Sequence, residues 1–442
     1  MQYNSQTPFS IEKLYQIFSD HPTICTDTRK VREGDIFFAL KGDNFNGNHF
    51  AVQALANGAA YAIIDEDIDD MAKHEDRLIR TNDTLTTLQA LAAYHRNQFN
   101  IPIIAITGSN GKTTTKELIH AVLSEKFKTY TTEGNLNNHI GIPLTILKIK
   151  KDAQIAIVEM GANHLGEIAG YCIYTRPTHG LITNVGKAHL EGFGGPEGVM
   201  KGQGELFDYL RAYGGSAFVM WDYEYLQIMS KGIGEVYSYG TNHADITGVT
   251  EQSSPFLKVK ITRGSSAGSI QTKLTGDYNL PNVLAAVCLG SYFKVEPDRI
   301  RKGIEDYEPS NSRSQLIQKG NNSIVLDAYN ANPSSMKLAI ENFVHFPAVN
   351  KILLLGGMME LGSDSLTEHE QIIRQIGKNK WKEVALVGGD FLKIKHPYRS
   401  FFNANEAGAW VASQTFDNTA ILVKGSRSMQ MEKTIQSLLQ KS

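Results

Sequence analysis

The sequence predicts an α/β protein of three domains in which parallel sheets are covered by helices. The chain has 442 residues, more than the roughly 100–200 residues of an ordinary domain, so we do not expect a single core. From Ile101 onward, apolar runs are followed by glycine and then by a helical pattern. After Pro309 the succession of strand and glycine resumes. Units of this kind are typical of parallel sheets with helices on both faces.

The composition is that of an ordinary globular protein. Lys and Arg number 44 against 46 Asp and Glu, so the net charge of -2 gives no reason to expect nucleic acid as a partner. The three cysteines show no metal-binding spacing, and we interpret them as reduced packing residues. The N-terminus lacks the order of a signal peptide, and no apolar run approaches the ~18 residues of a membrane span. We therefore expect a cytoplasmic protein without membrane insertion. We also expect a monomer, although no feature of the sequence fixes the oligomeric state.

We expect the first domain to cover residues 1–97, where short mixed elements prevail. Its polar, glycine-containing stretch KGDNFNGNHF, residues 41–50, is interpreted as an exposed loop. The second domain is expected over residues 98–308. Within it, residues 214–275 combine alternating and aromatic segments with a Gly/Ser-rich turn, which predicts an antiparallel patch.

The third domain is expected over residues 309–442. It holds four similar apolar runs, SIVLDAYNANP, KILLLGG, EVALVGG and AILVKGS. This repetition predicts a Rossmann-like domain. Its ligands should bind at the C-terminal ends of the strands.

The sharpest local feature is the segment TGSNGKT, residues 107–113, between an apolar strand and an amphipathic helix. Gly108 and Gly111 permit close approach of the backbone, and the helix N-terminus directs amides at an anion. Lys112 can reach the β and γ phosphates of a nucleotide, and Thr113 offers a hydroxyl to Mg²⁺. A glycine-rich turn with an incidental lysine is the alternative, but the flanking strand and helix favour a phosphate loop.

This loop departs from the common pattern G-x-x-x-x-G-K-[ST], whose first glycine would stand at Ile106. An ordinary kinase or GTPase loop is therefore disfavoured. Two further side chains follow neighbouring strands. Glu159 ends the buried run QIAIVE, where a carboxylate can hold a cation, although an isolated Glu is more often a solvated strand end. His189 can ligate a metal or donate to a phosphate oxygen, although a lone histidine is more often structural.

The form T-G-x-N-G-K-T resembles the loop of Mur ligases and folylpolyglutamate synthetases. Further motifs extend the resemblance to the Mur ligase family over nearly the whole chain, in particular to its branch that adds D-alanyl-D-alanine. In chain order, these motifs are Asp27–Arg29, Gly34–Gly42, ITGSNGKTTTKE, Thr132–Thr145, VEMGAN, NVGKAHLEGFG, Gly276–Asn282, Asn311–Gln315, Asp327–Pro333, Gly356–Gly362 and Leu422–Arg427.

The resemblance implies a role for residues that match the family motifs. The implied ATP contacts are Gly108, Ser109, Asn110, Gly111, Lys112, Thr113, Thr114, Asn279, Asn282, Arg313 and Asp327. The implied catalytic residues are Lys112, Glu159, His189 and Arg313, and the implied Mg²⁺ ligands are Thr113, Glu159 and His189. The implied contacts to the uridine diphosphate substrate are Thr28, Arg29, Lys41, Asn46, Asn135, Asn137 and Asn138. The implied contacts to the incoming amine are Asn330, Asn332, Lys424, Ser426 and Arg427.

Several of these residues also have simpler interpretations. Asn279 and Asn282 could cap a helix that begins near Leu280. Asp327 could merely end a strand, and Pro333 fits the first turn of a helix. Such structural roles are compatible with binding.

The chain departs from the family pattern at three places, of which Gln203 has the clearest chemical consequence. Asn46-Gly-Asn-His49 and Gly357-Met358 are the other two. Many Mur ligases carry at the position of Gln203 a lysine that is carbamylated and assists a second Mg²⁺. An amide cannot be carbamylated, and Lys201 lies about 200° away on a helix. We expect an enzyme without a carbamate, with a second Mg²⁺ that is weaker or water-mediated.

The resemblance implies an ATP-dependent ligase that uses Mg²⁺ and works through an acyl phosphate. Its implied substrates are a UDP-N-acetylmuramoyl tripeptide, with lysine or diaminopimelate as third residue, and D-alanyl-D-alanine. A ligase of the same superfamily that adds another amino acid or extends folate is one rival. A regulatory nucleotide-binding protein that has lost ligation is the other, suggested by Gln203. The N-terminal motifs, YNANP and KGSR favour the ligase that adds the dipeptide.

Overall fold

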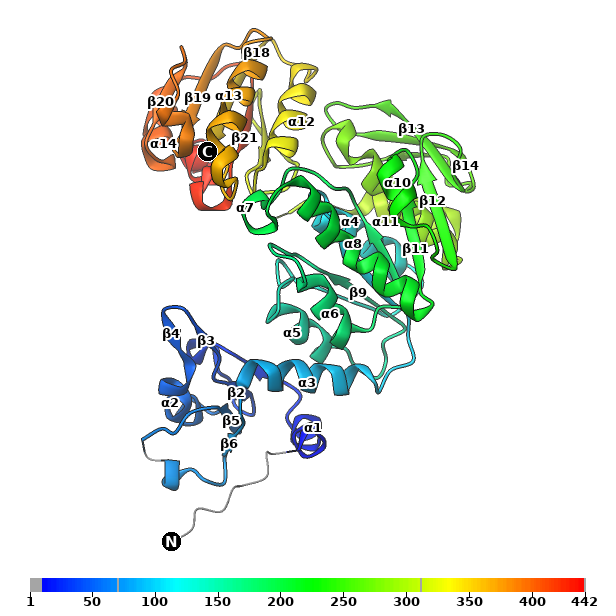
Figure 1. Ribbon diagram of the computed structural model, residues 1–442. Helices are drawn as coiled ribbons and strands as arrows, with labels where there is room; N and C mark the ends of the chain where they lie inside the picture. Colours follow the sequence, from blue (N-terminus) through cyan, green and yellow to red (C-terminus); the bar gives the residue numbers. More distant parts are fainter. Residues whose placement is uncertain (1–9, 70, 311, 441–442) are drawn as a thin grey trace. The chain divides into compact units, whose positions relative to one another are not determined.

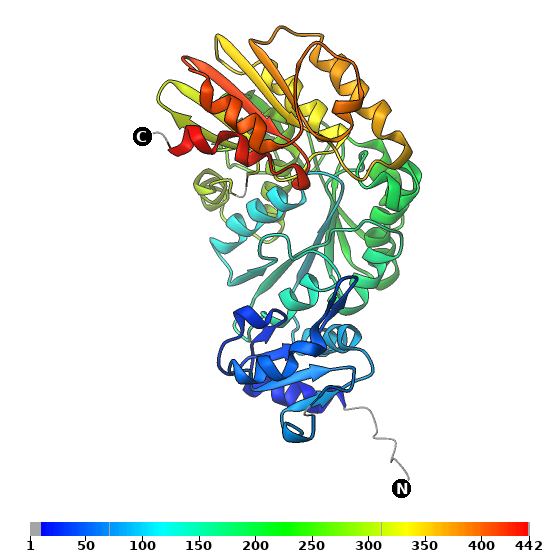
Figure 2. The same cartoon turned by 90° about the vertical axis from the view of Figure 1, so that its left-hand side faces the viewer.

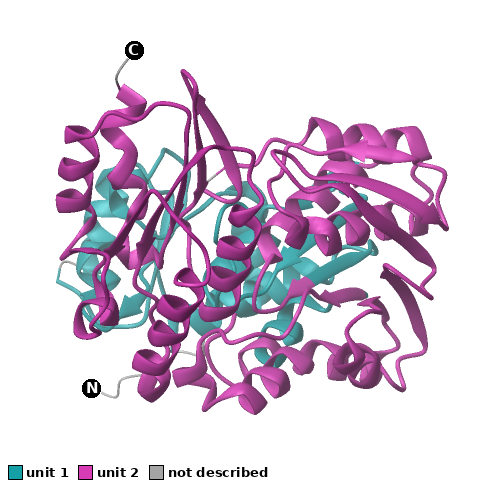
Figure 3. Cartoon of the chain, turned by 90° about the horizontal axis from the view of Figure 1, so that it is seen from above, with its two compact units in different colours: residues 1–105, 128–161, 169–178 teal, residues 106–127, 162–168, 179–442 magenta. Residues whose placement is uncertain are grey.

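The computed structural model describes residues 10–69, 71–310 and 312–440. Asn311, from one of the family motifs, lies outside the described residues. The chain divides into two compact units (Figure 3). Unit 1 comprises residues 1–105, 128–161 and 169–178, and unit 2 comprises residues 106–127, 162–168 and 179–442.

Unit 1 begins with a parallel sheet in the order β1-β2-β5-β6. Apolar side chains of β2 and β5 pack with helix α2 in one core cluster, which includes Phe37, Ala54 and Ile64. Helix α1 packs against α3 and buries Leu14 and Phe18. The elements are α1 (Ile11–Asp20), β1 (Ile24–Cys25), β2 (Ile36–Phe38), α2 (Ala51–Ala56), β5 (Tyr61–Ile64), β6 (Leu78–Arg80) and α3 (Thr84–Arg96).

The interpretation of residues 41–50 as an exposed loop is wrong in part. A short hairpin of β3 (Lys41–Gly42) and β4 (Phe45–Asn46) leads into a 3-10 helix, Gly47–Phe50. Asn48 is buried. Its side-chain amide donates to the carboxylate of Asp65 at 2.8 Å and accepts from the backbone N–H of Asp65 at 3.0 Å. These bonds to a distant segment fix the stretch in place.

Unit 1 also holds a second group of strands, in which β9 lies between β7 and β8. Strands β8 and β9 are parallel, and helix α5 packs against α3. Strand β9 is buried throughout, as expected for a strand covered on both faces. The elements are β7 (Ile103–Thr107), β8 (Thr129–Thr131), α5 (Gly141–Leu147), β9 (Ile155–Glu159) and α6 (Glu167–Thr175), of which β7 and α6 cross a unit boundary.

In unit 2, six strands follow the order β10-β11-β12-β13-β14-β15. The antiparallel patch predicted for residues 214–275 is wrong in part, because β11, β12 and β13 pair in parallel. Only β13, β14 and β15 are antiparallel. The strands are β10 (His179–Ile182), β11 (Ser216–Met220), β12 (Glu235–Gly240), β13 (Ile246–Gln252), β14 (Lys258–Arg263) and β15 (Ser269–Gln271).

Helices pack on these strands and on one another. The apolar helix α10 contacts α4, β12 and β13, and α11 also packs on α4. Helix α8 packs on β10 and α7. The helices are α4 (Lys112–Ser124), α7 (Leu190–Phe193), α8 (Pro196–Tyr213), α9 (Glu224–Met229), α10 (Leu280–Tyr292) and α11 (Pro297–Asp306). Within the part of the chain that the structure describes, no helix is long and apolar enough to cross a membrane.

The third sheet has the order β16-β17-β21-β18-β19-β20, and only the pair of β16 and β17 is antiparallel. This arrangement confirms the predicted Rossmann-like domain. Helices α12 and α13 cover the sheet (Figures 1 and 2). The elements are β16 (Gln315–Lys319), β17 (Asn322–Asp327), α12 (Pro333–Val344), β18 (Asn350–Gly356), α13 (Ser365–Ile376), β19 (Glu383–Val387), β20 (Arg399–Phe401), α14 (Ala404–Ser413), β21 (Thr419–Lys424) and α15 (Gln436–Gln440).

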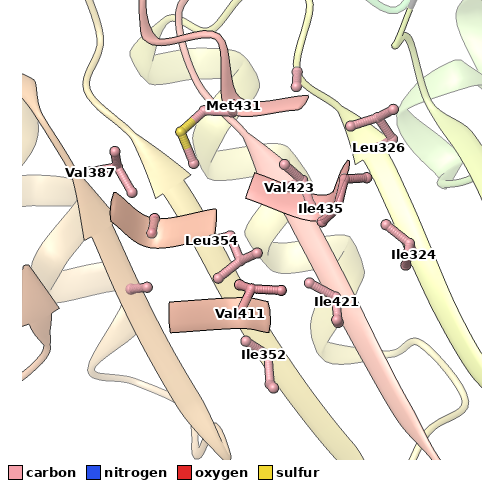
Figure 4. Close-up of a cluster of buried hydrophobic side chains, with 13 residues drawn as sticks. Ile324, Leu326, Ile352, Leu354, Val387, Val411, Ile421, Val423, Met431 and Ile435 are labelled. Atoms are coloured by element: carbon pink, nitrogen blue, oxygen red, sulfur yellow. The ribbon is translucent and has the colours of Figure 1, made fainter. Parts of the chain in front are cut away.

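One face of this sheet forms a buried core with α14 and the C-terminal 3-10 segment (Figure 4). Alternate residues of the strands, such as Ile352 and Leu354, point toward Val411, Met431 and Ile435. The period of two follows from strand geometry. This packing holds the C-terminal ends of β17, β18 and β21 side by side.

Candidate active site

The phosphate loop lies where the sequence predicted it, between the end of β7 at Thr107 and the start of α4 at Lys112. Gly108 and Gly111 have φ angles of +130° and +82°, in the region that favours glycine. A Cβ atom on Gly108 would lie 2.1 Å from Oγ1 of Thr183. Both glycines are therefore required by the shape of the loop.

Two residues beyond β10 hold the loop from outside. The backbone N–H of Ser109 donates to the carbonyl of Asn184 at 2.9 Å, and that of Asn110 donates to Oδ1 of Asn184 at 3.1 Å. The carbonyl of Asn110 accepts from the hydroxyl of Thr183 at 2.6 Å. The sequence motifs assigned no role to Thr183 or Asn184. Their position just after a strand that ends near the loop is the signal that could have identified them.

The polar side chains of the loop and the first turn of α4 suit a nucleotide phosphate. Lys112 Nζ donates to the carbonyl of Gly108, so the ammonium group lies over the loop. Thr113 and Thr114 are buried at the helix start. A cation, a hydroxyl and N-terminal amides together form a site for an anion and its metal counter-ion.

Gln203 is buried on α8 and touches the base of the loop. Its Oε1 accepts a hydrogen bond from the hydroxyl of Thr107 at 2.6 Å. Helix α8 runs unbroken from Pro196 to Tyr213, through Gly202 and Gly204. Gln203 is 2% exposed, whereas Lys201 is exposed. The helix therefore places Lys201 and Gln203 on different faces, as expected.

Asn279 and Asn282 lie next to the loop at the start of α10. Asn282 Oδ1 accepts from the hydroxyl of Thr115 at 3.0 Å, and its Nδ2 donates to Oδ1 of Asn279 at 2.8 Å. Asn279 is the N-terminal cap residue of α10 by position, but its side chain makes no capping bond. A Cβ on Gly111 would lie 2.8 Å from Asn282 Oδ1. Asn282 therefore packs directly against the phosphate loop.

Glu159 ends β9 in unit 1 and is 1% exposed. Its Oε1 accepts from Nδ2 of Asn137 at 2.8 Å, and its backbone N–H donates to Thr132 Oγ1 at 3.0 Å. Asn138 caps the turn before α5 through bonds to the N–H groups of Ile140 and Gly141, and Asn135 is exposed. The structure thus brings together Glu159 and Asn137, which the sequence had assigned to different ligands.

His189 precedes α7 in unit 2, in a left-handed conformation with φ of +52°. Its Nδ1 lies 2.6 Å from Oε2 of Glu360, and this contact lowers the pKa of the Glu360 carboxyl group. The backbone N–H of Glu191 donates to the carbonyl of Glu360 at 3.4 Å. Because Nδ1 faces Glu360, Nε2 is the nitrogen that can bind a cation or a phosphate oxygen.

The segment before α7 and the phosphate loop contact the third sheet domain within unit 2. Asn332 Nδ2 donates to Oδ1 of Asn110 at 2.8 Å, while Asn332 Oδ1 caps α12. The N–H of Lys187 donates to Ser334 Oγ at 3.2 Å, and Lys187 Nζ lies 2.5 Å from Glu368. Asn332, which the sequence predicted to bind the amine, therefore also contacts the phosphate loop.

Asp327 and Lys424 end the neighbouring strands β17 and β21 in register. Lys424 is 2% exposed and its Nζ lies 2.5 Å from Asp327 Oδ2. Asp327 Oδ1 accepts from the N–H of Ser314 at 3.0 Å. The guanidinium of Arg313 stacks on the ring of Tyr329 at 3.6 Å. Arg313 and Asp327, the two predicted nucleotide contacts of this domain, thus both contact other residues of the same domain.

The remaining predicted amine contacts lie around the ends of β17 and β21. The hydroxyl of Ser426 donates to the carbonyl of Ala331 at 3.1 Å and accepts from the N–H of Met359 at 2.9 Å. Asn330 is exposed, and Arg427 lies 3.1 Å from Glu432. The predicted location of ligands at the strand ends is consistent with this grouping.

The predicted uridine diphosphate contacts of the first domain form two polar groups. Arg29 makes two bonds of 2.8 Å to Asp27, whose pKa the bond lowers to about 2, and Thr28 is half-buried beside them. Lys41 lies 3.0 Å from Glu66, which also accepts from Asn46 at 2.8 Å. Both groups are preorganised by acidic neighbours that the sequence motifs did not assign.

A metal-binding cluster is not evident from side chains alone. Over residues 10–69, 71–310 and 312–440, no group of three or more His, Cys, Asp or Glu residues could hold a metal ion. The donors proposed from the sequence instead include a hydroxyl, a carboxylate and an imidazole. The hydroxyl and carboxylate oxygens are ligands that Mg²⁺ prefers, whereas an imidazole nitrogen is a less typical one.

Three models of protein domain families match the chain. They describe a Mur ligase family catalytic domain over residues 23–96, a Mur ligase middle domain over residues 106–290, and a Mur ligase, glutamate ligase domain over residues 312–427. Together they cover most of the sequence and follow the order of the three predicted domains.

Two curated relatives match almost the whole chain. Both are named UDP-N-acetylmuramoyl-tripeptide–D-alanyl-D-alanine ligase. The protein of Bacillus subtilis is 32% identical over 428 residues, which cover 94% of this chain and 93% of the relative. That of Escherichia coli is 34% identical over 440 residues, with 94% and 93% covered.

Solved structures give the same result. A crystal structure of MurF from Acinetobacter baumannii has a TM-score of 0.87 and 30% identity, and covers 98% of this chain and 99% of its own. A MurF ligase from Thermotoga maritima in complex with ADP has a TM-score of 0.83 and 26% identity, with 95% and 98% covered.

Proposed function

Because this chain belongs to the Mur ligase family, we propose for it the reaction after which its curated relatives are named. The chain is an ATP-dependent, ADP-forming ligase. It joins D-alanyl-D-alanine to UDP-N-acetylmuramoyl tripeptide and so supplies the pentapeptide precursor of peptidoglycan. The observation that carries this proposal is a similarity that covers 94% of the chain and includes a complete phosphate loop.

The reaction has two steps. The terminal carboxylate of the tripeptide attacks the γ-phosphate of ATP, and ADP leaves. The amine of the dipeptide, after loss of a proton, attacks the resulting acyl phosphate, and phosphate leaves as the amide forms. Lys112 and the loop amides offset the negative charge of the transferring phosphoryl group. Asn110, Asn279 and Asn282 position the nucleotide, with Arg313 and Asp327 from the third domain.

Mg²⁺ is proposed as the metal of this reaction, with Thr113, Glu159 and His189 as its ligands. When bound, it would neutralise phosphate charge. Two observations support the donor set. Glu159 is an almost fully buried carboxylate whose Oε1 is oriented by Asn137, and His189 is oriented through Nδ1 by Glu360. Gln203 can add only a neutral oxygen, which already accepts from Thr107.

The substrates are proposed to bind through the residues assigned from the family motifs. Thr28, Arg29, Lys41 and Asn46 contact the uridine diphosphate, and the segment from Asn135 to His139 faces the peptide. The dipeptide is bound by the residues at the strand ends of the third domain, Asn330, Asn332, Lys424, Ser426 and Arg427.

We propose domain boundaries after residues 97 and 308. The enzyme acts as a monomer in the cytoplasm, where ATP is available.

One experiment tests the function against both rivals. The purified protein is incubated with ATP, Mg²⁺, UDP-tripeptide and D-alanyl-D-alanine, and ADP is measured with each component left out in turn. We expect ADP only when both the UDP-tripeptide and the dipeptide are present. ADP formation with a folate or with another amino acid instead would favour the related ligases. Nucleotide binding without any ADP formation would indicate the regulatory protein.

A further inference from the structure

We propose that the carboxylate of Glu360 holds the ammonium group of the incoming dipeptide. This inference rests on the proposed function, because it concerns the amine substrate of that reaction. Glu360 lies in the connection between β18 and α13, at the C-terminal end of a central strand of the third sheet. The family motifs assigned it no role in binding.

The chemistry of the substrate requires an anionic partner at this place. Near neutral pH the dipeptide carries an ammonium group and a carboxylate. The five residues proposed to bind it contain two cations, Lys424 and Arg427, and three neutral side chains. These cations suit the carboxylate of the dipeptide and would repel its ammonium. Asp327 is the nearest acid to Lys424, at 2.5 Å, and offsets the charge of that lysine.

Glu360 is attached to the same group of residues through the backbone of its own segment. The N–H of Met359 donates to Ser426 Oγ at 2.9 Å, and the N–H of Ser426 donates to the carbonyl of Gly357 at 3.2 Å. These two bonds hold the segment that carries Glu360 against the start of the segment Ser426–Arg427. A carboxylate therefore stands beside a group of five residues in which the only charges are positive.

The side chain of Glu360 also contacts His189, a residue proposed to act at the phosphate. Its Oε2 lies 2.6 Å from Nδ1 of His189, while its side chain is 53% exposed. A half-exposed carboxylate has oxygen lone pairs left to accept a hydrogen bond from an ammonium group while it stays in contact with His189. An ammonium held there would lie between the dipeptide residues of the third domain and a residue proposed to act at the phosphate. This is the position that an attacking amine needs.

The substitution Glu360→Gln tests the proposal, because it keeps the shape of the side chain and removes its charge. We expect the KM for D-alanyl-D-alanine to rise about 10- to 100-fold, as for loss of a hydrogen bond to a charged group. The KM values for ATP and UDP-tripeptide should stay within about twofold. Glu360→Asp, which keeps the charge, should recover part of the loss.

Hydroxylamine distinguishes binding of the ammonium from an effect on the acyl phosphate. It is a mostly uncharged nucleophile near neutral pH and traps the acyl phosphate as a hydroxamate, with release of phosphate. The Glu360→Gln variant should form hydroxamate from ATP and UDP-tripeptide at the wild-type rate. An equal loss of hydroxamate formation would overturn the proposal, because Glu360 would then act through His189 on the phosphoryl step.

A neighbouring carboxylate provides the matched control. Glu191 is exposed on α7, and its backbone contacts that of Glu360. Glu191→Gln should leave the KM for the dipeptide unchanged. An unchanged dipeptide KM in Glu360→Gln, or an equal rise in Glu191→Gln, would contradict the assignment. If the wild-type protein forms no ADP with the dipeptide, the proposed function itself has failed, and the two failures are thereby distinguished.

Discussion

The amide oxygen of Gln203 accepts a hydrogen bond of 2.6 Å from Thr107, the residue that joins strand β7 to the phosphate loop. The two residues are 96 positions apart in the sequence. A neutral, buried amide thus stands where many members of the family carry a modified lysine. The bond positions the base of the loop and brings no negative charge to the phosphate site.

The first prediction is that catalysis does not depend on a carbamate. Turnover should be equal in CO₂-depleted buffer and in buffer with added bicarbonate, because Gln203 cannot be carbamylated and Lys201 lies on an exposed face of an unbroken helix. Substitution Gln203→Met, which removes the acceptor for Thr107, should lower the unfolding free energy by about 1 kcal/mol and raise the KM for ATP. Restoration of turnover by bicarbonate would refute the first expectation.

The second prediction concerns Lys112. Lys112→Ala should reduce ADP formation to a few per cent or less and leave the melting temperature nearly unchanged. The reason is that its ammonium group lies over the loop, beside the carbonyl of Gly108, and supports no apolar core. Lys126→Ala, at an exposed lysine beyond the same helix, serves as the control and should keep full activity. Substantial remaining activity in Lys112→Ala would be incompatible with the phosphate-loop assignment.

The phosphate loop could be predicted from sequence because its determinants are contiguous. Gly108, Gly111 and Lys112 fall within five residues, and the strand and helix beside them have clear patterns. The residues that hold the loop are Thr183 and Asn184, which lie 73 and 74 positions from Asn110 in the sequence. Such contacts depend on how strands are ordered in the sheet. A single sequence does not specify that order.

The same limit explains two errors in the fold. The alternating and aromatic residues of β11 and β12 predicted an antiparallel arrangement, yet helix α9 connects these strands and they pair in parallel. Strand β11 is buried at every position, as in a parallel sheet covered on both faces, and the helical crossover sets the strand direction. The stretch of residues 41–50 has loop-like composition, but Asn48 is buried because distant Asp65 satisfies its amide.

The third prediction is a dependence of stability on pH. His179 is buried on β10 among Phe218, Tyr292 and Phe293, and burial lowers its pKa from 6.5 to about 4. Because the folded protein favours neutral His179, its contribution is complete above about pH 6.5 and is lost as the pH falls toward 4. At about pH 5 the loss should amount to about 2 kcal/mol.

Urea unfolding of the wild type and of His179→Gln, at about pH 7.5 and about pH 5, measures this contribution. Gln can still bond the hydroxyl of Tyr292, which lies 3.1 Å from Nε2 of His179. Other titrating groups affect both proteins alike, so they cancel in the comparison. The wild type should lose about 2 kcal/mol more than the variant between the two pH values. Equal losses would show that His179 does not titrate in this range.

The last prediction is that an ion pair helps to dock the third domain on the phosphate site. Lys187 Nζ lies 2.5 Å from the carboxylate of Glu368, which is 7% exposed, and the N–H of Lys187 donates to Ser334 at the start of α12. Asn110 of the loop bonds Asn332 of the same helix start. Arg313 and Asp327 of this domain are proposed to reach the nucleotide. Docking should therefore be needed for turnover.

Charge reversal tests this role. Lys187→Glu places two carboxylates together, and it should raise the KM for the dipeptide and increase the radius of gyration measured by small-angle scattering with ADP and UDP-tripeptide present. The double variant Lys187→Glu with Glu368→Lys restores opposite charges. It should reverse about half or more of the increase in KM and of the increase in radius of gyration. Because Lys187 is 44% exposed, the pair should contribute only about 1 kcal/mol. Identical scattering of wild type and Lys187→Glu, or no recovery in the double variant, would show that docking does not depend on this pair.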